Sequence, residues 1–327
     1  MKISIITCFH NSERRLPAFF RALTALDAGS VTVEAVFVDN ASGDGTADHL
    51  AREALRLPWP ARVIREPKPG LMHARCAGVD AATGEWVLFL DDDNEPRADY
   101  LTELRRLTAT FPEAVFISGN CVPPPEYGLP DSMVQSAGYV ALRSRSGEFE
   151  FDLVGTSHPN GPWGAGLFCR RDELSAACAS WRAGDCRITG RTGTGLSGGE
   201  DHWIIHYLCR ERSRCAFSDR LVLVHRLDRH RLEPRHLVRV AYQLGADTPD
   251  HVDAFRALRP TLPKDYPQGW RVLTFFLVQL PRAVLRYWRR GTLGDLLWLC
   301  QSLGMGQSLA LRRWFEQAGH HAGRQRS

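Results

Sequence analysis

The chain has 327 residues, of which 44% are hydrophobic and 24% are charged, and its formal net charge is +4 at pH 7. This length suffices for the core of one large domain with an extension, or of two domains. The composition excludes an intrinsically disordered protein, and so small a net charge gives no argument for binding nucleic acid.

The nine cysteines show no CxxC spacing and are odd in number. Both facts disfavour a zinc site and a secreted disulfide framework, so a reducing cytosol fits best. The apolar segment at the N-terminus is too short for a signal peptide, and no run of about 18 apolar residues predicts a membrane-spanning helix. We therefore expect a cytoplasmic protein.

Strand and helix patterns alternate in the first third of the chain. Apolar runs predict strands at 3–7, 33–40, 61–66 and 85–90, and the last is apolar enough to be buried on both faces. Helical spacing follows at 16–26, from Thr46 to Leu55, at 70–82, and after Asp99, which is expected to cap its helix. Such alternation predicts an α/β fold with a parallel, doubly wound sheet.

The second half of the chain is less regular. A glycine-rich segment at 161–171 leads into a helix, another helix is expected to begin near Glu200, and a short strand at 220–226 ends in His225. After residue 231 the pattern is helical. We therefore divide the chain into a domain at 1–230 and a basic helical region at 231–327.

Polar side chains follow three of the predicted strands, where parallel sheets bind ligands. Thr7 and Asn11 follow the first strand, Asp39 the second, and the triplet 91–93 the fourth. Asp91 and Asp93 would point the same way on an extended segment, and such carboxylates suit Mg²⁺ or Mn²⁺. The alternative for the triplet is a turn or a helix cap, although Asp99 already supplies the next cap.

Five motifs occur in a fixed order: SIITCFHN, VFVDNASGDGT, GLMHARCAGVDAATGEWVLFLDDDNEP, GAGLFCRR and GGEDHWI. Together they resemble the family-two glycosyltransferases with the GT-A fold, over roughly residues 2 to 230. The resemblance implies a GT-A, doubly wound mixed sheet with a helical C-terminal extension. It also implies an inverting, metal-dependent transfer of a sugar from a nucleotide diphosphate donor to an acceptor hydroxyl.

The resemblance also implies a set of donor-binding residues. They are Thr7, Phe9, Asn11, Asp39, Arg75, Asp91, Asp92 and Trp163. A carboxylate at Asp39 could accept the imide N–H of uracil or thymine, or the donors of guanine, which favours UDP, dTDP or GDP, with UDP first. Asp39 could instead brace the turn at 42–46, Arg75 could be a surface residue, and Trp163 could stack on the sugar or belong to the core.

The catalytic and metal-binding residues follow from the same resemblance. Asp201 is expected to be the base that takes the acceptor proton, and Glu200 to orient donor or acceptor hydroxyls. Asp93 and Asp91 are expected to bind the metal, joined by His225, while the metal stabilises the departing nucleoside diphosphate. The alternatives are an acidic first turn of a helix for the pair at 200–201, and a locally bonded histidine at the strand end.

From residue 270 onwards there are nine arginines against two acidic residues, Asp295 and Glu316, mixed with apolar and tryptophan residues. Such a region could rest on an anionic membrane surface at the inner face of the cell membrane, pack on the catalytic domain, or form a dimer contact. The first alternative suits a lipid-linked or glycan acceptor in cell-surface polysaccharide or glycolipid assembly. Two rival functions are a nucleotidyltransferase that makes nucleotide sugars and a non-catalytic scaffold that binds them.

Overall fold

The computed structural model describes residues 1–129, 137–153, 164–186, 188, 190, 196, 198–262 and 274–324. The chain forms two compact units. The sheet unit comprises Met1–Gly128, Ala141–Leu227 and Leu258–Leu262, and the helical unit comprises Leu129–Val140, Asp228–Ala257 and Pro263–Ser327.

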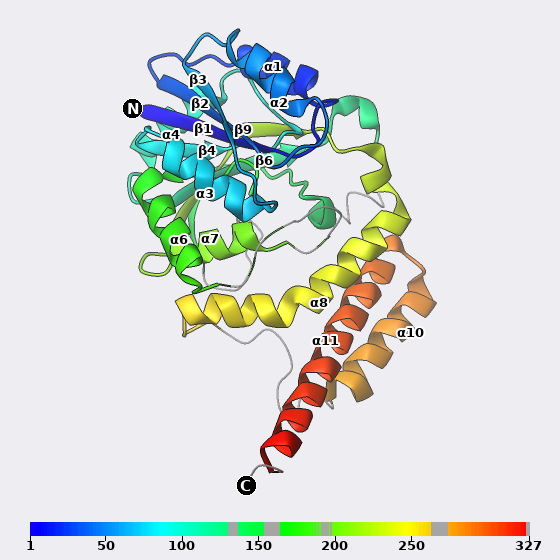
Figure 1. Cartoon of the computed structure of the whole chain (residues 1–327). Helices are drawn as coiled ribbons and strands as arrows, with labels where there is room; N and C mark the ends of the chain where they lie inside the picture. The colour runs from blue at the N-terminus through cyan, green and yellow to red at the C-terminus, as the bar shows by residue number, and fades with distance from the viewer. Residues whose placement is uncertain are drawn as a thin grey trace. The chain divides into compact units, whose positions relative to one another are not determined.

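The described part of the sheet unit contains one nine-stranded sheet (Figure 1). Parallel strands β3 (Ala61–Arg65), β2 (Thr32–Asp39), β1 (Lys2–Phe9) and β4 (Trp86–Phe89) form one side of it. The other side continues through β8 (Phe168–Arg170), β6 (Phe116–Val122), β9 (Arg214–His225) and β5 (Asn94–Pro96), while β7 (Glu148–Asp152) also pairs with β9. Because β8 runs antiparallel to β4 and to β6, the sheet is mixed, as the resemblance implied.

Helices cover both faces of this sheet. On one face α1 (Leu16–Thr24), α2 (Thr46–Ala54) and α4 (Tyr100–Thr110) share an apolar cluster with β1 and β2. On the other face α3 (Leu71–Ala81) packs on β1 and β2, followed by α6 (Arg171–Ala183) and α7 (Glu200–Leu208) (Figure 1). The four strands predicted at the start of the chain and the alternating helices are therefore confirmed, and the fold class is α/β.

The expectation that Asp99 caps α4 was wrong in one respect. Asp99 stands at the N-cap position, but its side chain makes no capping hydrogen bond. Arg97 donates instead to both carboxylate oxygens, from Nε to Oδ1 at 2.6 Å and from Nη2 to Oδ2 at 2.7 Å. This bidentate, charge-assisted pair is stronger than a bond from one helix N–H, so the carboxylate turns to the arginine.

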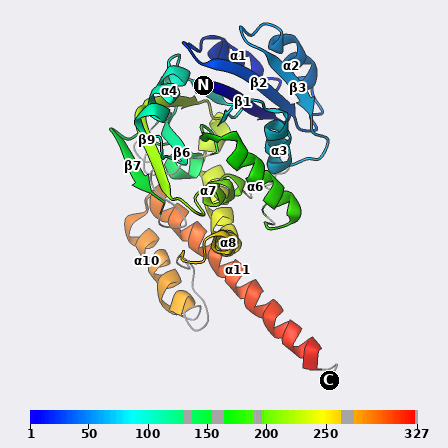
Figure 2. The same cartoon turned by 90° about the vertical axis from the view of Figure 1, so that its left-hand side faces the viewer.

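In the helical unit, the described elements are α8 (Pro234–Leu258), a π-helical turn at Phe275–Gln279, α10 (Leu280–Arg290) and α11 (Leu293–Arg324). Short 3-10 turns lie at Ala137–Val140 and Arg229–Leu232 in this unit, and another lies at Pro125–Tyr127 in the sheet unit. The neighbours α10 and α11 lie side by side (Figure 2). None of the described helices combines the length and the low polarity needed to cross a bilayer.

Two glycines set the crossing of α8 and α11. A side-chain carbon added at Gly245 would lie 1.9 Å from the carbonyl oxygen of Gln301, and one added at Gly304 would lie 2.0 Å from that of Tyr242. Both distances are far below van der Waals contact. The two helix backbones therefore touch at this crossing, which only glycine permits at either position.

A buried carboxylate joins the first two strands to the turn before β4. Glu34 on β2 is 5% exposed and accepts hydrogen bonds from Ser4 Oγ at 2.6 Å, the Thr83 hydroxyl at 2.8 Å and Arg62 Nη2 at 2.9 Å. The backbone N–H groups of Thr83 and Gly84 donate to it as well. Burial acts to raise the pKa of Glu34, but these hydrogen bonds lower it to about 2.

The Glu34→Gln variant should be less stable by about 2–3 kcal/mol at pH 7, because an amide group replaces a buried, charged acceptor of several hydrogen bonds. A carboxylate whose pKa is lower in the folded than in the unfolded protein stabilises the fold at pH values above its unfolded pKa. This stabilisation is lost as the pH falls through the folded pKa. The gap between variant and wild type should therefore shrink between about pH 4.5 and pH 2. Urea unfolding at pH 7 and pH 3 measures it.

The matched control is Glu85→Gln, which breaks an exposed ion pair with Arg170. It should change the free energy of unfolding by less than about 1 kcal/mol at either pH. A gap for Glu34→Gln that is equally large at pH 7 and pH 3 would contradict the role given to its charge.

Candidate active site

The carboxyl ends of β1, β2 and β4 lie at one edge of the sheet. Ile6 pairs with Phe89 and Phe9 with Asp39, so the residues that follow these strands meet there. The expectation of an extended segment after β4 was wrong. The chain turns at once, and the N–H of Asn94 donates to the carbonyl of Asp91 at 3.0 Å. The three aspartates sit on this turn, and their side chains therefore diverge.

A different basic side chain neutralises each carboxylate of the triplet. The pairs are Asp91 with Arg75, Asp92 with Arg15, and Asp93 with His225. The three partners come from α3, from the residue before α1, and from the end of β9. Three adjacent negative charges are thus tolerated because the fold brings a cation to each of them.

Asp92 faces α1. Its two oxygens each lie 3.1 Å from Arg15 Nη1, and Ser12 Oγ donates to Oδ2. Burial raises the pKa of Asp92 to about 6, with a further rise from Asp93, while Arg15 opposes both. The expectation that Asp92 contacts the nucleotide sugar is corrected accordingly: this carboxylate anchors the turn to the start of α1.

Asp93 and His225 form a buried pair. Asp93 Oδ1 lies 3.3 Å from His225 Nε2, and both side chains are less than a tenth exposed. Burial acts to lower the pKa of His225, but the Asp93 carboxylate raises it to about 10. The pairing of β5 with β9 brings them together, since Asn94 stands opposite His225 and donates to Asp93 Oδ1 at 3.2 Å.

This pair fits a divalent cation, which would displace the proton of the His225 imidazole on binding. Adjacent ligands of an octahedral Mg²⁺ ion lie about 3 Å apart, close to the separation of Asp93 Oδ1 and His225 Nε2. Among the described residues, no group of three or more histidine, cysteine, aspartate or glutamate side chains is arranged around a common point. A catalytic Mg²⁺ or Mn²⁺ ion needs fewer, because substrate phosphates and water complete its shell.

Arg75 links the two ends of the site. Its guanidinium is 3% exposed and lies on α3, where Nη2 is 3.8 Å from Asp91 Oδ1 and Nη1 donates to Glu200 Oε1 at 3.3 Å. It also lies 5.3 Å from the ring centre of Phe89. Arg75 is therefore not the surface residue of the alternative, and Glu200, 5% exposed at the start of α7, is held by it.

Asp201 is fixed by backbone amides. Its Oδ2 accepts the N–H of Gly164 at 2.8 Å, and its Oδ1 accepts the N–H of His202 at 2.8 Å. Burial acts to raise the pKa of Asp201, but His202, Arg75 and these two amides lower it overall. Asp201 is therefore an ionised carboxylate in a fixed orientation, and each oxygen keeps a lone pair for a further proton or hydrogen bond.

Gly164 lies between the arginine and this carboxylate. A side-chain carbon added there would be 2.3 Å from Arg75 Nη2 and 3.0 Å from Asp201 Cβ. A glycine at this position is thus required for Arg75 and Asp201 to approach each other. The sequence motif GAGLFCRR contained this glycine, but only the structure shows what it contacts.

Phe9 does not belong to the site. Its ring is fully buried and makes edge contacts with Phe19 and Phe37, at 5.4 and 5.8 Å between ring centres. Side chains alternate along a strand, so Phe9 faces α1 with the core. The expectation that its side chain contacts the nucleotide was wrong. Its neighbour Cys8 faces the site instead. Burial raises the pKa of the Cys8 thiol to about 12, and the Arg75 guanidinium opposes the rise.

Asn11 and Asp39 brace the turn that follows β2. Asn11 has a φ of 52°, its side-chain oxygen accepts the N–H of Gly43 at 2.8 Å, and its backbone N–H donates to Ser42 Oγ at 3.1 Å. Asp39 is 3% exposed, and its Oδ1 accepts the N–H of Ser42 at 3.3 Å. One oxygen of Asp39 thus has the bracing role of the alternative. Base recognition through the other oxygen stays a prediction.

The contacts described above do not include two other residues that were expected to bind the donor. Thr7 is fully buried on β1, and its hydroxyl makes no hydrogen bond within the described residues. Trp163 lies outside the described residues. Neither prediction is tested by the geometry.

Sequence reasoning missed three residues of the site: Cys8, Asn94 and Gly164. Alternation along β1 could have identified Cys8, because Phe9 packs in the core on the opposite face of the strand. Asn94 donates to Asp93 and accepts the N–H of Asp91 at 3.2 Å, a local pattern typical of asparagine in turns. Gly164 had no local signal, since its role depends on two distant side chains.

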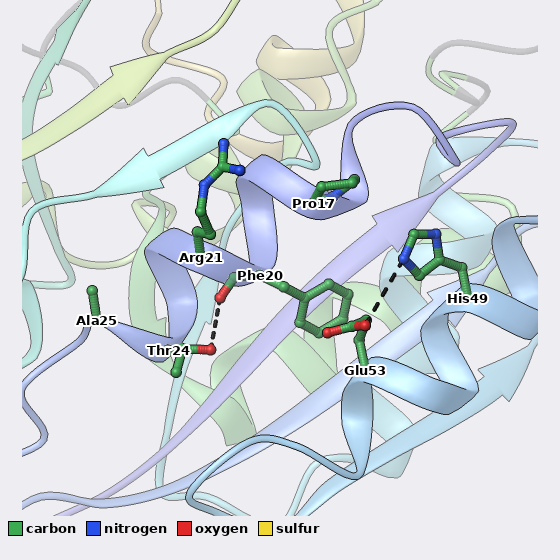
Figure 3. A pocket seen from close by; sticks show the side chains of 7 residues that line it. All are labelled: Pro17, Phe20, Arg21, Thr24, Ala25, His49 and Glu53. Atoms are coloured by element: carbon green, nitrogen blue, oxygen red, sulfur yellow. Dashed lines mark hydrogen bonds and ion pairs between the residues drawn. The ribbon is translucent and has the colours of Figure 1, made fainter.

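A hollow of about 540 Å³ lies elsewhere, between α1 and α2 (Figure 3). Its lining residues are Pro17, Phe20, Arg21, Thr24, Ala25, His49 and Glu53. Its ionisable side chains include His49 and Glu53, whose Nε2 and Oε1 atoms are 4.0 Å apart. It shares no residue with the carboxylate cluster, so we place the candidate active site at the strand ends and not in this hollow.

Comparison with known proteins gives matches at the level of sequence. Residues 4–135 match the family model described as glycosyl transferase family 2. The chain is 26% identical over 104 residues to the glycosyltransferase EpsH of Bacillus subtilis, and 37% identical over 81 residues to the succinoglycan biosynthesis protein ExoO of Rhizobium meliloti. These segments cover 32% and 25% of this chain, and only 29% and 23% of those relatives.

Two solved structures share the fold. The TarS 1–349 fragment of S. aureus, in complex with UDP-GlcNAc, matches with a TM-score of 0.52 and 16% identity over 95% of this chain and 92% of that one. The mannosyltransferase PcManGT of Pyrobaculum calidifontis, in complex with GDP-Man and Mn²⁺, matches with a TM-score of 0.54 and 16% identity over 95% and 87%. At this identity the likeness concerns the fold alone.

Proposed function

Because residues 4–135 make this chain a member of glycosyl transferase family 2 and its sheet has the GT-A fold, we propose that it is a glycosyltransferase that inverts the anomeric carbon. It moves a sugar from a nucleotide diphosphate donor to an acceptor hydroxyl. The observation that carries this proposal is the linked set Asp91, Arg75, Glu200 and Asp201. It connects the sheet edge at which the donor would bind with the ionised carboxylate of Asp201.

In this mechanism Asp201 removes the proton of the acceptor hydroxyl as that oxygen attacks C1 of the sugar. The bonds from Gly164 and His202 hold the carboxylate in one orientation, so little reorganisation is needed. Glu200 and Asp91 hold the buried Arg75, which keeps a positive charge beside the reacting groups. A base opposite the leaving group leads to inversion at C1.

Asp93 and His225 would hold the divalent ion, Mg²⁺ or Mn²⁺. Bound there, such an ion would supply Lewis-acid stabilisation of the departing nucleoside diphosphate. Asp91 was expected among the ligands as well, but its side chain faces Arg75 instead. The fit of Asp93 and His225 to octahedral ligand spacing supports this assignment, and the fold relative from Pyrobaculum calidifontis is described with Mn²⁺.

We propose a UDP sugar as the donor, on the basis of the Asp39 carboxylate at the end of β2. The acceptor we propose is a glycan or a lipid-linked sugar in cell-surface polysaccharide or glycolipid assembly. The relative named for succinoglycan biosynthesis supports that setting. We further propose that residues 1–230 form the catalytic domain, that residues 231–327 are a separate helical region, and that the protein works in the cytoplasm at the inner face of the cell membrane.

The test of donor recognition is a thermal shift of the full chain with UDP, dTDP, GDP, ADP and CDP, each with and without Mn²⁺. A diphosphate at 100 times its Kd should stabilise the protein by about 2.7 kcal/mol. For a domain of this size that is a rise in Tm of about 5 °C or more. We expect the rise with UDP and only in the presence of Mn²⁺.

The other outcomes of this test are also informative. A Mn²⁺-dependent rise with GDP or dTDP would keep the family function and replace the donor. A rise with ADP or CDP alone would contradict the role given to Asp39. No rise with any diphosphate would contradict the assignment of Asp39 and Asp93 and would favour a protein without donor-dependent activity.

A further inference from the structure

The segment that leads into and forms α10 carries a row of apolar side chains on its exposed surface. Leu277 in the π-helical turn is 67% exposed and Trp288 is 80% exposed. Pro281, Val284 and Leu285 lie between them and are exposed as well. The spacing of four, three and four residues from 277 to 288 places them along one side of the helix, which we call the α10 stripe.

This stripe is not the side by which the segment packs on its own unit. Phe275 is buried with Val252 of α8 and Leu309 of α11, and Phe276 and Leu280 pack against the same cluster. Ala283 is fully buried in the first turn of α10. The segment thus has two apolar sides, and the described residues of the helical unit cover only one of them.

Arginines border the α10 stripe. Arg282, Arg286, Arg289 and Arg290 are all exposed, and α10 contains no acidic residue. Arg286 pairs with Asp295 and lies 5.3 Å from the ring centre of Trp298. Three guanidiniums beside one exposed tryptophan therefore have no acidic residue on their own helix.

Exposed leucine and tryptophan between arginines are the groups that interfacial helices bury in a lipid surface. The indole of a tryptophan favours the headgroup region, and arginine guanidiniums bind phosphates bidentately while their apolar stems cover the boundary. A second copy of this chain fits poorly, because a symmetric contact would bring two sets of four arginines together. With 11 residues, α10 is also too short to cross a bilayer.

We propose that the α10 stripe is a docking surface for an anionic lipid bilayer, with Leu277, Val284, Leu285 and Trp288 in the boundary and the arginines on lipid phosphates. This docking proposal deepens the proposed function. It depends on that function only in assuming a lipid-linked acceptor. Docking of this kind would hold the enzyme beside such an acceptor. It would weaken with salt, because the headgroup attraction is screened.

Flotation of the full chain with phosphatidylcholine vesicles, with and without 30% phosphatidylglycerol, tests the proposal. We expect binding to the anionic vesicles in 0.1 M salt, little binding to neutral ones, and loss of binding in 0.5 M salt. Trp288→Ser should lower the partition coefficient about tenfold or more, since a buried aromatic side chain is lost from the boundary. The triple variant Arg282→Gln, Arg289→Gln and Arg290→Gln should bind anionic and neutral vesicles equally weakly.

The matched control is Leu55→Ser, because Leu55 is 88% exposed and lies on the sheet unit. It should bind vesicles as the wild type does. Equal binding by Trp288→Ser and Leu55→Ser, or no binding by wild type, would overturn the proposal. Trp288-dependent dimerisation in size-exclusion chromatography without vesicle binding would assign the stripe to a second copy. The thermal shift with diphosphates contains no lipid, so failure of docking and failure of the proposed function are distinguishable.

Discussion

Replacing Asp201 with asparagine should lower kcat by about 10³-fold while the affinity for the donor stays close to that of the wild type. General base catalysis contributes roughly 10²- to 10⁴-fold, and a factor of 10³ corresponds to about 4 kcal/mol of barrier. Asparagine has the shape of aspartate but cannot accept the proton. Because the pKa of Asp201 is lowered, the wild-type carboxylate is already ionised at neutral pH, so the variant loses a base that is fully available.

The measurement is steady-state release of nucleoside diphosphate with the acceptor present, together with calorimetric binding of the donor. The matched control is Asp172→Asn. Asp172 is the second residue of α6, as Asp201 is of α7, and it accepts the N–H of Glu173 at 2.9 Å, as Asp201 accepts that of His202. If Asp201 served only the first turn of its helix, the two variants would behave alike.

The Asp201→Asn variant also places an amide where two backbone N–H groups donate. One of these bonds must be lost, at a cost of about 1–3 kcal/mol in the free energy of unfolding. Circular dichroism and the thermal shift with donor separate this loss from the loss of turnover. Turnover equal to that of the wild type in the folded variant would contradict the assignment of the base.

Replacing Asp93 with asparagine should abolish the Mn²⁺ dependence of donor binding. Partners that merely orient a ligand change metal affinity by about 10- to 100-fold, so loss of a direct ligand should cost at least about 100-fold. The variant also leaves the buried His225 cation without its carboxylate partner. Breaking such a buried pair lowers the free energy of unfolding by about 3–5 kcal/mol. Binding should therefore be measured by calorimetry well below the Tm of the variant, with Mn²⁺ and with EDTA.

The neighbouring residue supplies the control for this prediction. Asp92→Asn removes a carboxylate of the same turn that faces Ser12 and Arg15 instead of His225. We expect it to keep Mn²⁺-dependent donor binding and to lose stability only. If Asp92→Asn lost the metal dependence and Asp93→Asn kept it, the metal ligand would be Asp92 and not Asp93.

The first four strands could be predicted because their signal is local. Continuous apolar runs at β1, β2 and β4 are read without knowing what they pair with. The strands β6 and β8 could not be predicted in the same way. Gly119 and Asn120 interrupt β6 at a register shift against β9, and β8 is three residues long, so their strand character comes from their neighbours in the sheet.

For the site, the residue types were predicted better than their geometry. Motif order pointed to Asp201 and to the triplet, and the structure places Arg75 between Asp201 and Asp91. The turn that carries the triplet is closed by a local hydrogen bond from Asn94 to Asp91, which the expectation of an extended segment overlooked. The separate cations of the three aspartates are tertiary contacts, so the sequence could not show them. Phe9 was misplaced for a simpler reason: its direction follows from alternation along β1, which places it with the core.

The contact of α8 with α11 has a consequence for tracing the ancestry of this chain. The family match ends at residue 135, so alignments offer little guidance to the helical unit beyond it. Gly245 and Gly304 each exclude every side chain, since even a single carbon would meet the opposing backbone. A homologous chain that keeps this helix pair must keep both glycines or separate the two helices, so a glycine pair 59 positions apart gives a simple marker for recognising the unit among divergent sequences.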